Sequence, residues 1–186
     1  MKRTDVKYLE NCHQHSYGND RFIPPVMVFM CGVSRWGRND GFTRTNKKVS
    51  INVVTLGNIA FRQQEQSHTI SPGEAFIART GCGCTFRTGP RGFAHKRFII
   101  LGGNGLEFLL RETGLEQTDF VHPIMPGRVL MLMRQAYGIM RDKPRSYTNI
   151  LSGLAYQLLL ELARSVRPDY PPELREIIDY MKRNVT

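Results

Sequence analysis

The chain has 186 residues, 41% of them hydrophobic, and a formal net charge of +10, enough for one domain with a core plus an appendage. No stretch approaches the roughly 18 apolar residues of a membrane span, and the polar N-terminus lacks a signal peptide, so we expect a cytoplasmic protein without a membrane partner. In that reducing compartment the four cysteines are expected as thiols, not disulfides. The basic residues form no helical basic face, so charge alone does not indicate nucleic-acid binding.

The first two regions differ sharply in composition. Residues 1–24 are polar and lead into Pro24 and Pro25, which favours an arm or an edge strand because proline cannot donate a ladder hydrogen bond. Residues 25–102 contain short β-rich runs bounded by Gly, Pro, Asn or Ser, which favour a barrel or sandwich over a parallel sheet. The predicted strands are 26–31, 49–56, 59–63, 67–70, 74–80, 84–87 and 96–101.

Within this region, residues 67–86 show the clearest alternation of strands and turns. SHTISPGEAFIARTGCGCTF reads as a strand, a Pro-Gly turn, a second strand, a Gly-bracketed turn and a third strand. That pattern is typical of a small antiparallel barrel.

After Gly102 the hydrophobic period changes from two to about 3.6, which predicts helices. Asn104 is expected to cap a helix over 105–113, and Gly114 to end it. The further predicted helices are 128–140 and 147–166, separated by Lys143 and Pro144, and then 173–184 after a Pro-bracketed linker at 167–172.

The helix over 147–166 is apolar around much of its circumference. Leu151, Leu154, Leu158 and Leu162 recur at three- and four-residue steps, which suits a helix-on-helix seam between two copies. We therefore expect a homodimer. The alternative is that the preceding helix buries both faces within one chain.

Four segments together resemble a known family. PGEAFIARTGCGCTF, KRFIILGGNGLEFLLRETGL, SYTNILSGLAYQLLLELA and ELREIIDYMKRN follow one another as in the effector-binding and dimerisation half of AraC-type transcriptional regulators. The resemblance implies a fold that is mainly β with C-terminal α: a cupin-like antiparallel β-barrel, or jelly roll, followed by a helical dimerisation region. It implies an N-terminal arm at 1–24, the effector-binding barrel at 25–102, the dimerisation region at 103–166, a linker at 167–172 and the start of a DNA-binding domain at 173–186.

The helix-turn-helix motifs expected of such a regulator do not occur before Thr186. We therefore expect the regulatory part of a longer transcription regulator, which contacts DNA only through the missing domain. The resemblance also implies a small-molecule effector, such as a carbohydrate, in the barrel. Its ligand-binding residues are expected to be Arg35, Cys84, Phe86, Lys96 and Phe98, to which we add Trp36 because an indole is a good stacking platform.

Two alternatives stay open, a stand-alone cupin binding protein and a metal-dependent cupin enzyme. The enzyme would need clustered His and carboxylate ligands on neighbouring strands, whereas only His13 and His15 are closely spaced. We expect no catalytic residue, no metal and no cofactor. A zinc site would require the arm to fold back and join Cys12, His13, His15, Cys82 and Cys84.

Overall fold

A computed structural model describes residues 9–15 and 23–166 as antiparallel strands followed by helices. The strands are β1 (Leu9–Gln14), β2 (Met27–Trp36), β3 (Gly41–Thr45), β4 (Val49–Gly57), β5 (Ile59–Gln63), β6 (Gln66–Ile70), β7 (Ala75–Ala78), β8 (Gly83–Thr88), β9 (Ala94–Gly102) and β10 (Phe120–Val121). The helices are α1 (Leu106–Glu112), α2 (Pro126–Asp142) and α3 (Tyr147–Val166).

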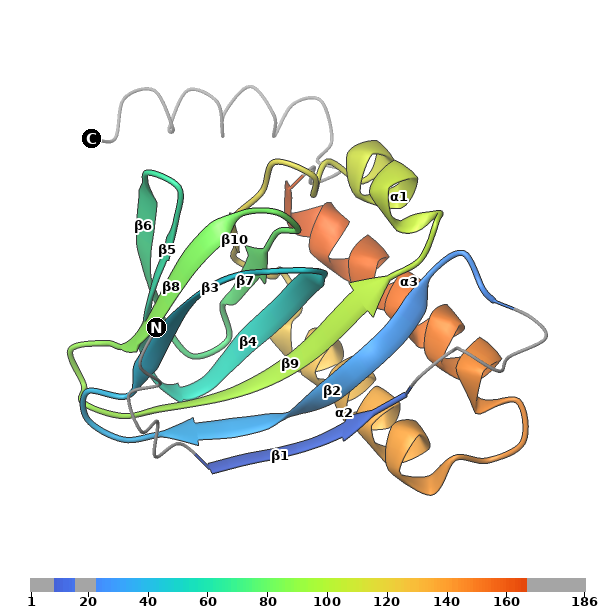
Figure 1. The fold of residues 1–186 in the computed structure, drawn as a ribbon, viewed down its shortest axis with the longest axis horizontal. Helices are drawn as coiled ribbons and strands as arrows, with labels where there is room; N and C mark the ends of the chain where they lie inside the picture. The colour runs from blue at the N-terminus through green and yellow to red at the C-terminus, as the bar shows by residue number, and fades with distance from the viewer. Residues whose placement is uncertain (1–8, 16–22, 167–186) are drawn as a thin grey trace.

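The strands form two sheets that face each other (Figure 1). One has six strands in the order β1-β2-β9-β4-β7-β10, and the other has four in the order β3-β8-β5-β6. The chain crosses repeatedly between the sheets, so that β2 to β9 divide into two four-stranded halves, the arrangement of a jelly roll. The expected fold class, mainly antiparallel β with C-terminal helices, is confirmed, although the two sheets are not closed into a continuous barrel.

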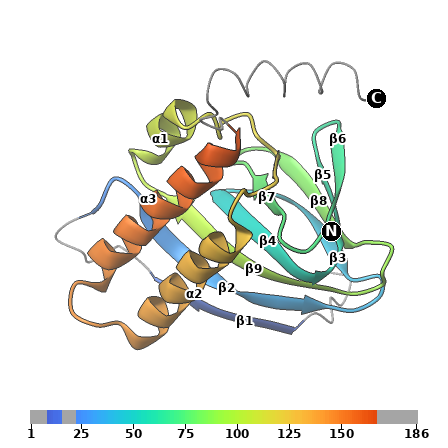
Figure 2. The same ribbon diagram turned by 180° about the vertical axis from the view of Figure 1, so that it is seen from behind.

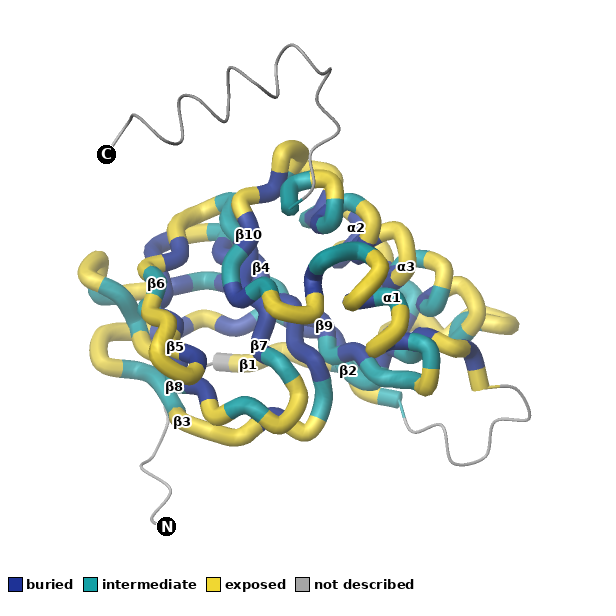
Figure 3. The backbone as a smooth tube through the Cα atoms, turned by 90° about the horizontal axis from the view of Figure 1, so that it is seen from above, coloured by how far each residue is buried: buried dark blue, intermediate teal, exposed yellow. Residues whose placement is uncertain are grey.

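The six-stranded sheet is covered on both faces. Helices α2 and α3 lie across its outer face, as Figure 2 shows, and the four-stranded sheet faces its inner side. Two apolar clusters result, one between sheet and helices around Ile51, Ile99 and Leu158, the other between the sheets around Phe61 and Phe86. Figure 3 marks the buried residues along the strands of the sheets and along the helices.

Most predicted strands occur near their expected positions, but three strands were not predicted. β1 belongs to the expected arm, β3 alternates weakly, and β10 has only two residues. β1 pairs antiparallel with β2, opposite Met30 to Arg35. Part of the arm is therefore an edge strand of the larger sheet.

The helix ends follow the sequence signals with one exception. Gly114 has φ 75° just after α1, and Lys143 ends α2 with φ 47°, as the break before Pro144 predicted. The predicted cap at Asn104 is wrong, because the N-cap position of α1 is Gly105 and no side chain caps it. The predicted linker at 167–172 and helix at 173–184 lie outside the described residues.

The leucine stripe of α3 lies mostly inside one chain. Leu151, Leu158 and Leu162 are fully buried against α2 and the sheet, and Leu154 packs half-buried beside them. Buried in this way, the first three are not available to a second copy. The expected dimer seam along these leucines is corrected to an internal core contact, because α2 and β2 cover the face that the sequence left without a partner.

Among the described helices, none is long and apolar enough to cross a membrane.

Replacing Leu158 by alanine is expected to lower the free energy of unfolding by about 2–5 kcal/mol, because it leaves a cavity in the helix–sheet core. Met131→Ala on the neighbouring helix α2 is the control, since Met131 is 40% exposed, and should cost well under half as much. Urea denaturation of both variants measures the difference. Equal losses would contradict the assignment of Leu158 to the core.

Candidate ligand-binding site

Five of the six predicted ligand-binding residues lie between the two sheets. Trp36, Cys84, Phe86, Lys96 and Phe98 are all buried there, with exposures of 6% or less. Cys84 and Phe86 share one face of β8, and Lys96 and Phe98 share one face of β9, because alternate residues of a strand point the same way. The structure thus brings Trp36 of β2 together with residues of the consecutive strands β8 and β9, which follow much later in the sequence.

Arg35 does not join them. It precedes Trp36 on β2 and therefore points to the opposite face of the sheet. There it is exposed and lines a separate cavity of about 310 Å³ with Glu10, Asn11 and Val33.

Lys96 is the central polar residue between the sheets. Its ammonium group is 2.7 Å from Oδ1 of Asn52 on the neighbouring strand β4, to which it donates a hydrogen bond. The Asn52 amide in turn donates to Oγ of Ser50 at 3.0 Å. The aromatic rings surround the same amine, with Nζ at 4.8 Å from the centre of Phe98, 5.5 Å from Trp36 and 5.9 Å from Phe86.

This enclosure changes the proton affinity of the amine. Burial is the main reason that the pKa of Lys96 falls from 10.5 to about 7; the charge of Glu10 opposes the shift and that of Arg44 adds to it. Loss of hydration penalises the charged form, and the aromatic faces and Asn52 replace only part of it. Near neutral pH, Lys96 therefore exchanges between a cation and a neutral amine.

Strand β1 brings an acid to the edge of this interior, where Glu10 itself stays exposed. Glu10 accepts a hydrogen bond from Oγ of Ser34 at 2.8 Å. The close approach depends on Gly32, opposite Cys12 in the β1–β2 ladder: a Cβ there would lie 2.6 Å from the Asn11 carbonyl oxygen and 2.8 Å from the Phe98 ring. Only a residue without a side chain lets β1 pair while Phe98 keeps its position.

The Cys84 thiol is held by residues at the end of β3. Asn46 donates its amide hydrogen to the Cys84 sulfur at 3.0 Å, and the thiol donates to the Arg44 carbonyl oxygen at 3.5 Å. Burial raises the pKa of Cys84, which favours the protonated thiol that this donation requires. The sulfur thus acts as both donor and acceptor within the protein.

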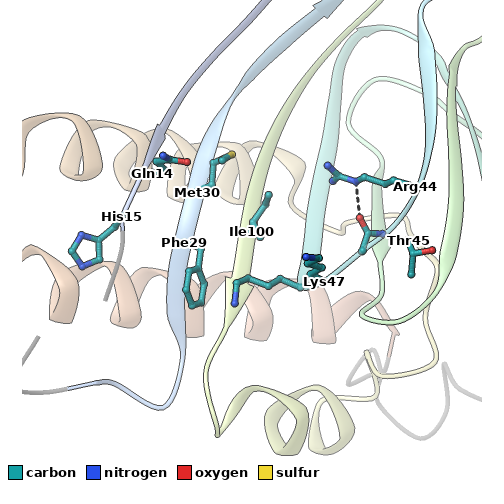
Figure 4. Close-up of a pocket in the computed structure, with 10 residues that line it drawn as sticks. Gln14, His15, Phe29, Met30, Arg44, Thr45, Lys47 and Ile100 are labelled. Atoms are coloured by element: carbon teal, nitrogen blue, oxygen red, sulfur yellow. Dashed lines mark hydrogen bonds between the residues drawn. The ribbon is translucent and has the colours of Figure 1, made fainter. Parts of the chain in front are cut away.

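A cavity of about 420 Å³ opens at the mouth between the sheets (Figure 4). This mouth cavity has the size of ordinary small-molecule sites. Two features connect this cavity to the buried interior. Strand β9 carries both Lys96 of the interior and Ile100 of the cavity wall. The ring of Phe86 in the interior lies 5.6 Å from the guanidinium of Arg44, which lines the cavity. Its lining residues are Gln14, His15, Phe29, Met30, Arg44, Thr45, Asn46, Lys47, Lys48 and Ile100.

None of the six predicted residues lines the mouth cavity itself. Sequence reasoning missed Arg44, Asn46 and Asn52, because their positions depend on pairing between distant strands. One signal was present for Asn52, an amide between Ile51 and Val53 in a strand that is mostly apolar. A buried amide in such a run needs a hydrogen-bond partner, and Lys96 supplies it.

The residues weighed for zinc do not come together. Within residues 9–15 and 23–166 the structure contains no group of three or more His, Cys, Asp or Glu side chains placed to hold a metal ion. Cys12, His13, His15, Cys82 and Cys84 all belong to those ranges. His15 instead contacts Tyr147 of α3, and His13 packs on Tyr137 of α2.

No family model matches the chain, and no curated protein matches it in sequence. Solved structures with similar folds include a cupin superfamily protein from Desulfitobacterium hafniense, 11% identical over 54% of this chain and 83% of that one, with a TM-score of 0.41. KdgF from Halomonas sp. is 13% identical over 53% of this chain and 83% of its own, with a TM-score of 0.40. The Cupin_2 domain of an XRE family transcriptional regulator from Enterobacter cloacae is 10% identical over 50% and 94%, with a TM-score of 0.38. Similarity at this level concerns the arrangement of strands and does not extend to ligand or activity.

The protonation of Lys96 should be visible in the stability of the protein. Between about pH 7 and 10.5 the unfolded chain holds a proton that the folded chain has released, so stability should rise with pH by up to about 1.4 kcal/mol per unit in that window. Below about pH 7 both states are protonated and this contribution is flat.

Lys96→Met should remove the rise, and Lys143→Met, at an exposed position, should retain it. Urea unfolding of the three proteins at about pH 6, 7.5 and 9 measures the slopes. The informative quantity is the slope, since the methionine also leaves Oδ1 of Asn52 without its donor. A slope unchanged in Lys96→Met would show that the amine is not the titrating group.

Proposed function

We propose that this chain is the effector-binding and dimerisation part of an AraC-type transcriptional regulator. A small polar molecule such as a carbohydrate binds between the two sheets, and the α2–α3 region joins two copies. A DNA-binding domain beyond residues 1–186 then responds to the bound ligand. The chain itself binds its ligand without chemical conversion.

The observation that carries the proposal is the buried amine of Lys96. Hydrogen-bonded to Asn52 and walled by Trp36, Phe86 and Phe98, it offers a fixed polar group among apolar surfaces. Small-molecule sites usually consist of a few fixed polar groups within a largely apolar enclosure. The mouth cavity lies further along the same face of β9, where its lining residue Ile100 follows Lys96 by four residues.

The order of elements supports the regulatory part of the proposal. A jelly roll followed by two long packed helices corresponds to the effector-binding and dimerisation regions that the sequence resemblance implies. Strand β1 also contacts both parts: Gln14 lines the mouth cavity, while Asn11 accepts a hydrogen bond from the Tyr137 hydroxyl of α2 at 2.9 Å. Ligand and helices thus contact opposite faces of one strand.

The contact between copies is assigned to the exposed face of α3. Ile150, Tyr156 and Leu160 are each more than 40% exposed, and Gly153 between them has open space at its Cβ position. They are spaced three or four residues apart and so share one side of the helix. We propose this face as the dimer contact in place of Leu151, Leu154, Leu158 and Leu162, which pack within one chain.

Ligand binding is tested with a thermal-shift screen of neutral monosaccharides and small organic acids against the chain. A ligand should raise the melting temperature of the parent protein and of Lys143→Met. Lys96→Met should remain folded by circular dichroism and lose most of the shift. If nothing in the screen binds, or if Lys96→Met binds normally, the site is not between the sheets.

Dimerisation is tested by Leu160→Glu, which should convert a dimer to a monomer in light scattering, because a carboxylate would be desolvated at the contact. Gln135→Glu, at an exposed position of α2, is the control and should remain dimeric. Fusion to a DNA-binding domain that represses only as a dimer gives a second readout. A dimer that persists in Leu160→Glu, or a parent protein that is monomeric, contradicts the assigned face.

A stand-alone binding protein and an enzyme are separate outcomes of the same work. A natural gene whose reading frame ends at Thr186 would favour the stand-alone module. Turnover of a bound compound, detected by mass spectrometry after incubation, would favour the enzyme.

A further inference from the structure

The mouth cavity has an unbalanced charge. Arg44, Lys47 and Lys48 line it, and none of its described lining residues is Asp or Glu. None of the ion pairs formed among the described residues includes these three cations. Three positive charges around one cavity attract an anion and repel a cation.

Arg44 is held in place by contacts that leave part of its guanidinium available. Its Nε donates to Oδ1 of Asn46 at 2.8 Å, and the group lies 5.0 Å from the ring centre of Phe42 and 5.6 Å from that of Phe86. Among the described residues, no hydrogen bond uses its terminal nitrogens Nη1 and Nη2. Figure 4 shows the side chain extending from β3 toward the strand that carries Ile100.

Apolar side chains form another part of the wall. Met30 of β2 and Ile100 of β9 line the cavity together with Phe29. Lys48 lies over the Phe29 ring, with Nζ 3.6 Å from its centre, a cation–π contact that fixes the ammonium group beside the apolar wall. The cavity is therefore cationic on one part and apolar on another.

We propose that the mouth cavity binds a small amphipathic anion, with its carboxylate or phosphate on Arg44, Lys47 and Lys48 and its apolar part on Met30 and Ile100. This inference rests on the proposed function and names the ligand class of that sensor. The planar guanidinium presents parallel N–H groups that match the two oxygens of a carboxylate or phosphate. The two ammonium groups add charge without that geometry and favour either anion.

The test measures binding of three probes by isothermal titration calorimetry at low salt: hexanoate, hexyl phosphate and the neutral hexanamide. At least one anion should bind about tenfold or more tightly than hexanamide, and added salt should weaken it. Arg44→Gln should weaken binding of the anion about tenfold, because a neutral amide replaces the charged guanidinium and its parallel N–H donors. Arg87→Gln is the matched control, since Arg87 is an exposed arginine of the same sheet that does not line the cavity.

The two anions distinguish the sources of negative charge. Binding of hexanoate alone assigns a carboxylate ligand, and binding of hexyl phosphate alone assigns a phosphate. Equal binding of hexanamide, no binding by either anion, or unchanged binding in Arg44→Gln overturns the inference. A neutral sugar that binds and is lost in Lys96→Met, while no anion binds, leaves the proposed sensor in place and removes only its anionic ligand; if neither kind of molecule binds, both proposals fall.

Discussion

The larger sheet has no solvated face across its central strands, and this constraint organises the molecule. On β4, the run from Val49 to Val54 is buried throughout, with helices on one side and the second sheet on the other. Any polar group on the inner face must find its partner inside the protein. Asn52 and Lys96 meet that requirement through each other, at 2.7 Å. The same burial that demands the hydrogen bond also makes the amine easy to deprotonate.

Most of the fold could be predicted from local sequence patterns. Turn residues and apolar runs predicted β4, β5, β6 and β8 closely, since each is short and bounded by a clear signal. β1 was hidden because LENCHQ has no apolar run, and β3 because both its faces are half-exposed or exposed. Pairing with β2 and β8 stabilises these two strands, and such pairing between distant segments is not visible in a local window.

The site was predictable where side chains alternate within one strand. Knowing that Cys84 and Phe86 share a face requires only the period of a strand, and the same holds for Lys96 and Phe98. The same period separates Arg35 from Trp36. Arg44 could not be placed, because its position depends on the pairing of β3 with β8. The leucines of α3 show a further limit: a stripe that packs on a neighbouring helix has the same spacing whether that helix belongs to its own chain or to another.

Gly32 lets the edge strand β1 and the Phe98 ring approach the same point of β2. The β1–β2 ladder and the Phe98 ring both approach this residue to within a distance that no side chain tolerates. Any substitution must therefore displace the edge strand, the aromatic ring or both, although Gly32 lines neither the cavity nor the helix contacts. Variation at this one backbone position would change how firmly the first strand is attached while leaving the charged groups of the mouth untouched. Because Gln14 of β1 lines the mouth cavity, closure of the pocket along that edge depends on this one glycine.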